Sequence, residues 1–195
     1  EYWGELSFNG LEFGLEGPFR KGGNSSYLAA YRHSFTSVLE ALGVNLKESA
    51  DYQDLSFRLN FPTRKAGTFS LTGIGGQSKI ALKDSDEDPD EWLFDSHGED
   101  LATSSRLWAL GLSHVYFLNQ NTRIRSHLSF ISSGIETAID TFDLSSSEPF
   151  RWAGENTREN KLSASFSLMK KFNRKNSLDL GAVYDLFMVR YADSQ

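Results

Sequence analysis

Apolar and polar side chains alternate one by one over long stretches of this chain. The clearest run is DLSFRLNF at residues 54–61, where every second residue is apolar and the residues between are polar or charged. Successive side chains of a β-strand point to opposite faces, so such a run predicts a strand with one apolar and one polar face. The alternation therefore predicts an all-β chain.

The same pattern predicts about eight strands that follow one another along the chain. Short polar turns such as PTRKAG at 62–67 join the strands in pairs, and residues 35–50, 83–103 and 143–157 form longer connections. SVLE at 37–40 has the spacing of a helix capping box, which predicts one short helix near 36–43. The expected strands are residues 5–17, 25–34, 51–61, 67–82, 104–118, 122–142, 158–172 and 177–191.

Two runs lose their alternation locally. At Asn9-Gly10 the apolar positions shift by one residue, which predicts a β-bulge in the strand at 5–17. At GIGG, residues 73–76, glycines replace apolar side chains, which predicts room for the strand to bend or to pass a bulky neighbour.

The length of the strands favours a membrane protein. Most of the runs are about twice the 5 to 6 residues that strands of soluble sheets average. Strands of roughly 10 residues, with short turns at one end and long loops at the other, are typical of barrels in the bacterial outer membrane. The sequence therefore predicts the wall of an antiparallel, up-and-down transmembrane β-barrel, with lipid against its apolar face.

The alternation also assigns a direction to individual side chains. If Leu55 and the apolar residues at every second position after it face lipid, the polar residues between them face the lumen. The side chains predicted to face the lumen are Asp54, Ser56, Arg58, Asn60, Arg123, Arg125, Asp179 and Asp185. Aromatic residues near the short turns predict a girdle at the membrane interface: Phe19, Phe61, Phe69, Phe117 and Phe172.

Composition narrows the class further. Hydrophobic residues make up 39% of the chain, and no run of about 18 apolar residues occurs, which argues against a helical membrane protein. The chain has no cysteine, so it has neither a disulfide framework nor a thiolate metal site. A net charge of −6 at pH 7 argues against a nucleic-acid partner.

Two groups of metal-ligating residue types carry weak signals. DSDED at 84–88 has the alternating oxygens of a calcium loop, but Pro89 and Asp95 occupy positions where that loop needs glycine and a bidentate acid. We therefore expect the acidic segment 83–103 to be a solvated loop. The four histidines, His33, His97, His114 and His127, share no ligand spacing and predict no metal site.

One further motif matches an enzyme signature. Ser167 and Lys170 have the Ser-x-x-Lys spacing of acyl-transfer enzymes, but residues three apart on a strand point to opposite faces. We therefore assign no catalytic residue, cofactor or metal ligand, and no individual ligand-binding residue. The expectation is a protein that is not an enzyme.

Both chain ends are expected on the side of the long loops, since the first predicted strand runs into a short turn and the last runs out of one. A complete outer-membrane barrel keeps both ends in the periplasm. We therefore expect residues 1–195 to be one segment of a larger barrel, with at least one strand before residue 1 and further strands after residue 195.

Several stretches resemble one known family. LEFGLEGPF at 11–19, SYLAAYR at 26–32, DYQDLSF at 51–57, LNFPTRKAGTFSL at 59–71 and GIGG at 73–76 are similar to segments of TonB-dependent outer-membrane receptors of the Bacteroidetes type. The resemblance is tight over residues 5–82 and looser beyond. It implies early strands of a 22-stranded barrel that follow a plug domain.

The resemblance also implies a function. Such receptors take up a scarce nutrient actively: an iron chelate, a glycan, a peptide or a vitamin. The implied partners are outer-membrane lipid, the plug and remaining strands of the same protein, the TonB complex acting through parts outside this sequence, and a surface lipoprotein that caps the barrel. No residue role is carried over, because ligand contacts in the family vary with the substrate.

Two other functions are consistent with the pattern. A self-contained eight-stranded outer-membrane barrel acting as an adhesin or structural anchor would join its first and last strands by hydrogen bonds. A soluble ligand-binding β-protein would enclose Phe57, Phe166 and Leu180 in a dry interior and leave Arg58 and Asp179 in water.

Overall fold

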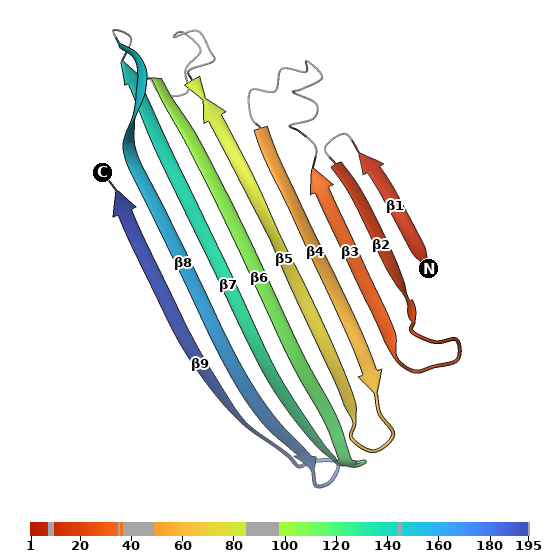
Figure 1. Ribbon diagram of the computed structural model, residues 1–195. Helices are drawn as coiled ribbons and strands as arrows, with labels where there is room; N and C mark the ends of the chain where they lie inside the picture. Colours follow the sequence, from red (N-terminus) through yellow and green to blue (C-terminus); the bar gives the residue numbers. More distant parts are fainter. Residues whose placement is uncertain (8–9, 35, 37–48, 85–97, 144–145, 195) are drawn as a thin grey trace.

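A computed structural model of the chain describes residues 1–7, 10–34, 36, 49–84, 98–143 and 146–194. Within these residues, nine strands form one antiparallel sheet in which each strand pairs with its neighbours in sequence (Figure 1). The prediction of an all-β, antiparallel, up-and-down chain is confirmed. The strands are β1 (Tyr2–Ser7), β2 (Gly10–Pro18), β3 (Ser26–Ser34), β4 (Ser49–Pro62), β5 (Thr68–Lys83), β6 (Gly98–Asn119), β7 (Thr122–Asp143), β8 (Ser146–Lys171) and β9 (Ser177–Ser194).

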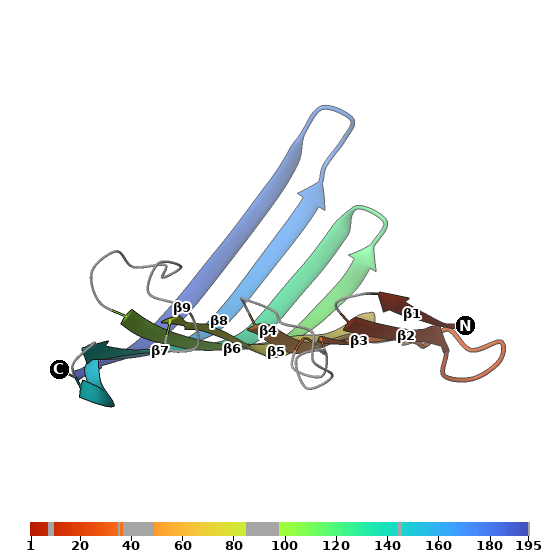
Figure 2. The same cartoon turned by 90° about the horizontal axis from the view of Figure 1, so that it is seen from above.

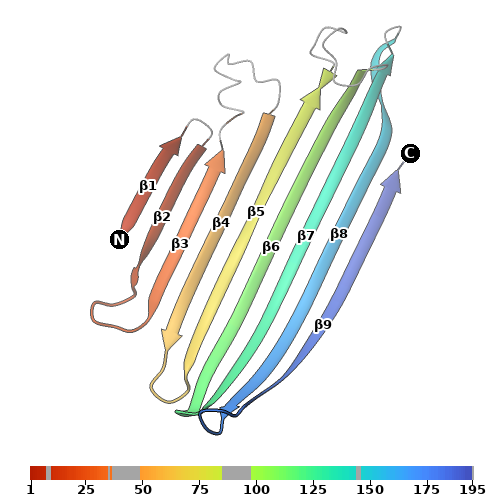
Figure 3. The same cartoon turned by 180° about the vertical axis from the view of Figure 1, so that it is seen from behind.

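The sheet is open and curved. Figures 1 and 3 show β1 and β9 at opposite edges, and among the described residues no strand pairs with the outer side of either. Seen from above in Figure 2, the short-turn ends of β6–β9 sweep away from the line formed by their other ends. Such a twist follows from the right-handed twist of each strand. None of the described residues belongs to a helix long and apolar enough to cross a membrane.

The predicted first strand at 5–17 is wrong, because this part of the chain is a hairpin. Strand β1 pairs antiparallel with β2, and Ser7 lies opposite Gly10. Gly10 therefore begins a second strand, and the change in alternation does not mark a bulge within one strand. As a result the sheet has nine strands, and the prediction that both chain ends lie on the same side is also wrong. The amino group of Glu1 donates to the carbonyl of Glu16 at 2.6 Å, near the short turn that follows β2.

The connections at the other end also differ from the prediction. Residues 143–157 were expected to be a loop, but β7 continues to Asp143 and β8 already begins at Ser146. Strand β6 likewise begins at Gly98 instead of residue 104. Polar and charged residues interrupt the alternation at these strand ends, but the backbone pairing continues. The predicted helix near 36–43 lies outside the described residues except for Thr36.

Candidate functional site

The strand register divides the side chains between two faces. Residues opposite each other in an antiparallel pair point to the same side of the sheet. Leu59 of β4 lies opposite Tyr27 of β3 and Leu71 of β5, and Leu71 lies opposite Leu112 of β6. We call the face of these residues the apolar face, and the face that carries Arg58 the polar face.

Apolar side chains form a continuous band on the apolar face. One row of cross-strand neighbours within it runs from β2 to β9: Leu15, Ala29, Phe57, Gly73, Leu110, Phe130, Leu162 and Leu186. Among the described residues no apolar side chain is buried, and Trp108 and Leu180 are 55% and 54% exposed. A contiguous apolar surface of this extent is not stable in water and requires a cover.

The apolar band crosses the rows of cross-strand neighbours at an angle. In β8 the band ends at Leu162 on the side of the long connections. The cross-strand row of Leu162 contains Phe57 in β4 and Leu15 in β2. The band extends further in those strands, however, to Leu55 and Leu11. This stagger corresponds to a strand tilt of roughly 25°, and the band is roughly 20 to 30 Å tall. A flat apolar layer crossed by tilted strands has this form.

Two glycines of β5 let aromatic rings lie close to the backbone on the apolar face. A Cβ on Gly73 would lie 2.3 Å from the ring of Phe57, and a Cβ on Gly75 would lie 2.1 Å from the ring of Trp108. Both glycines are buried, although no apolar side chain on this face is buried among the described residues. The prediction that GIGG makes room for a bulky neighbour is confirmed.

Aromatic rings also gather where the predicted girdle lies. Phe19 stacks on Phe61 with ring centroids 5.4 Å apart, and Phe69 stacks on His114 at 4.3 Å. Phe117 departs from the expectation, because the register places it on the polar face. The exposed members at this end of the sheet are Phe19, Phe61, Phe117 and Phe172.

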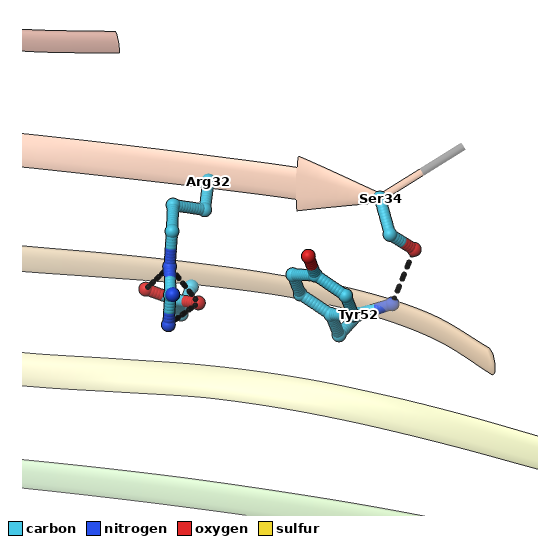
Figure 4. A network of polar contacts seen from close by, with 4 residues as sticks. Arg32, Ser34 and Tyr52 are labelled. Atoms are coloured by element: carbon cyan, nitrogen blue, oxygen red, sulfur yellow. Dashed lines mark hydrogen bonds and ion pairs between the residues drawn. The ribbon is translucent and has the colours of Figure 1, made fainter. Parts of the chain in front are cut away.

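A network of polar contacts lies on the polar face of β3 and β4 (Figure 4). Arg32 Nε donates to both carboxylate oxygens of Asp54, at 3.2 and 3.0 Å, and the guanidinium carbon lies 6.0 Å from the ring centroid of Tyr52. Ser34 Oγ accepts from the backbone N–H of Tyr52 at 2.9 Å and donates to the carbonyl of Ala50 at 3.1 Å. The partly exposed ion pair adds little stability by itself, so the network mainly fixes the direction of its polar groups.

Further polar contacts cross the same face toward β9. Ser70 Oγ donates to Asn60 Oδ1 at 2.8 Å, and Lys161 Nζ lies 3.2 Å from Asp185 Oδ2 and 4.8 Å from the ring centroid of Phe187. The register places all the predicted lumen residues on this one face: Asp54, Ser56, Arg58, Asn60, Arg123, Arg125, Asp179 and Asp185. That they share a face is confirmed, and that this face lines a lumen stays a prediction.

Charged groups occupy the strand ends beyond the band. Arg151 Nη2 lies 3.4 Å from Asp140 Oδ2, and its Nε makes a closer contact with the same carboxylate. The hydrogen bond and the charge of Asp140 raise the pKa of Arg151. The negative charges of Asp193 and Glu155 raise the pKa of the Tyr191 hydroxyl. Charges of both signs at these ends are typical of strands that protrude into water.

A groove of about 350 Å³ lies just beyond the apolar band, toward the long connections. Its lining includes Gln77, Lys79, Ser104, Arg106 and Glu136, all of which the register places on the apolar face. The prediction assigned no role to these residues. Lys79, Arg106 and Glu136 are far apart in sequence, and only the register brings them together.

The candidate chemical motifs remain separate in the structure. Among the described residues, no group of three or more histidine or acidic side chains is placed to hold a metal ion. The calcium-like segment after Asp84 and His97 lie outside the described residues. Ser167 lies opposite Arg125 and Lys170 opposite Thr122, so the register places the two on opposite faces as predicted.

Comparisons with protein-family models, with curated proteins and with solved structures found no match to this chain.

Proposed function

We propose that this sheet is part of the wall of an outer-membrane β-barrel, with its apolar face in lipid. The tilted, continuous apolar band on one face of the sheet is the observation that carries the proposal. A flat hydrocarbon layer explains both its height and its angle to the strands. The polar face then lines the lumen, where the network around Arg32 and Asp54 meets water or protein.

We further propose that the intact barrel is a TonB-dependent receptor that imports a nutrient. The resemblance over residues 5–82 supports this family, and the implied substrate is an iron chelate, a glycan, a peptide or a vitamin. A plug domain would contact the polar face, the TonB complex would act on the plug, and a surface lipoprotein would cap the long-loop side. Nothing in this arrangement requires a cofactor.

The structure offers less support for the two other functions. A soluble protein would enclose Phe166 and Leu180, which are 48% and 54% exposed on a single-layered sheet. A self-contained barrel would pair β1 with β9, and within the described residues these strands lie at opposite edges. The two open edges favour pairing with further strands of the same wall.

Single cysteines test the membrane location, because the chain has no cysteine of its own. In the intact protein in lipid vesicles, a water-soluble maleimide is expected to label Asp54→Cys and Arg58→Cys but not Leu55→Cys or Leu59→Cys. A lipid-soluble maleimide is expected to give the reverse pattern, since these residues alternate between the faces. Equal labelling of both sets by the water-soluble reagent would refute the membrane wall.

Growth under nutrient limitation tests the receptor function separately. A strain lacking the intact protein is expected to grow poorly on one limiting iron chelate, glycan, peptide or vitamin, and deletion of TonB is expected to give the same defect. Expression of the wild-type protein restores growth only in the first strain. An adhesin or anchor would leave growth on every such nutrient unchanged, which would refute uptake without affecting the membrane location.

A further inference from the structure

Three arginines lie in one row of cross-strand neighbours. Arg106 of β6 is opposite Gly134 of β7, Gly134 is opposite Arg158 of β8, and Arg158 is opposite Arg190 of β9. A Cβ on Gly134 would lie 3.0 Å from Arg106 Nε, so the Arg106 side chain lies across this glycine. We call Arg106, Arg158 and Arg190 the arginine row. Like charges opposite each other on a sheet repel, so the row favours an anion.

The arginine row lies just outside the apolar band, on the side of the long connections. Arg106 is two residues before Trp108 and Arg190 is two residues after Met188, each on the apolar face. All three arginines are exposed, and within the described part of the chain none has a carboxylate within 4.0 Å. Their guanidinium groups are therefore free to bind a group from outside the sheet.

The nearest acids on this face do not cancel the charge of the row. Glu136 and Asp51 belong to the next row outward, together with Lys79. The groove described above lies between this outer row and the arginine row, since Lys79, Glu136 and Arg106 all line it. Two acids against four cations leave the region positive. A compact anion is therefore the expected occupant.

We propose that the arginine row binds the phosphate of an anionic lipid headgroup in the leaflet on the long-connection side. The inference rests on the proposed membrane location, in which the acyl chains cover the apolar band directly beneath the row. Guanidinium groups bind phosphate oxygens through paired hydrogen bonds. An anion held there also removes the repulsion between Arg158 and Arg190.

The test measures lipid binding to the intact protein in detergent by native mass spectrometry. Phosphatidic acid is compared with phosphatidylcholine of the same acyl chains, whose phosphate is balanced by choline. Arg158→Gln/Arg190→Gln removes two charges from the row, and Arg123→Gln/Arg125→Gln removes two from the polar face of β7 as the matched control. Glu136→Gln removes the nearest acid.

We expect phosphatidic acid to bind about 25-fold more weakly to the Arg158→Gln/Arg190→Gln variant, since each basic group near a lipid surface contributes about fivefold. The control variant is expected to bind like the wild type, Glu136→Gln is expected to bind more tightly, and phosphatidylcholine binding is expected not to change. Equal binding of phosphatidic acid by the two double variants would overturn the proposal.

Three other results separate the sources of failure. Displacement of phosphatidic acid by millimolar inorganic phosphate would assign the row to a free anion and overturn the lipid as its ligand. Cysteine labelling that does not alternate along β4 would refute the membrane wall, and the lipid site would fall with it. Alternating labelling without preference for phosphatidic acid would refute the lipid site alone.

Discussion

Replacing Leu128 with arginine is expected to lower the free energy of unfolding of the intact protein in lipid by about 2 to 4 kcal/mol, the cost of a cation near the middle of the bilayer. Leu128 is 49% exposed on the apolar face, between Leu112 of β6 and Ala164 of β8. Both cross-strand neighbours of an arginine there are apolar, so the charge must deform the lipid or carry water into it. Urea unfolding in phospholipid vesicles, followed by tryptophan fluorescence, measures the change.

The adjacent residue provides the matched control. Ser129 follows Leu128 in β7 but points to the polar face, where its neighbours are Gly111 and Ser163. Ser129→Arg adds the same charge at the same depth, and we expect a change below about 1 kcal/mol. Similar losses for the two variants would mean that both faces meet the same medium, and the apolar band would then not be a lipid-facing surface.

The parts of the fold that the sequence predicted well are those that cross the apolar band. Strands β4, β5 and β7 begin and end within about two residues of their predicted bounds, because a strand between two different media needs one apolar and one polar face. The same requirement assigned Leu180 and Asp185 of β9 to the correct faces, although Val183 and Phe187 make its polar face partly apolar. The alternation thus follows the division of the sheet into an apolar face and a polar face.

The errors lie where that requirement ends. Beyond the band the alternation stops, so the start of β8 resembles a loop, although Ser146 still lies opposite Asp143 of β7. The hairpin at Ser7 and Gly10 was missed for another reason. A change in the alternation has the same appearance in a bulge as at the start of a second strand.

The candidate sites depend on strand register, which the sequence pattern did not provide. Arg106, Arg158 and Arg190 come from three strands, and each alone is an ordinary polar residue at the end of an apolar run. Only pairing through Gly134 shows that they form one row. The alternation alone places each arginine on the apolar face of its strand. The order and register of the strands are also needed to show that the three arginines are neighbours.

Among the residues of the short turns, Gly67 is the one at which an added methyl group is expected to lower the free energy of unfolding most. Its φ of +79° is unfavourable for any other residue, and a Cβ would lie 2.2 Å from the carbonyl oxygen of Val115 in β6. The Gly67 carbonyl also accepts the backbone N–H of Thr63 at 2.8 Å, which closes the turn between β4 and β5. The turn is held against β6 by the contact of His114 Nε2 with the carbonyl of Ala66 at 2.6 Å.

Gly67→Ala is therefore expected to lower the free energy of unfolding by about 3 kcal/mol or more, since backbone strain of about 1 to 2 kcal/mol adds to a clash with backbone atoms that cannot move freely. Gly22→Ala is the matched control, because Gly22 has a φ of +74° and no atom within 4 Å of its Cβ position. Strain alone predicts a loss of about 1 to 2 kcal/mol there. Urea unfolding of both variants in vesicles separates the backbone strain from the clash with β6. Equal losses of unfolding free energy in the two variants would show that β6 does not pack against the turn as described.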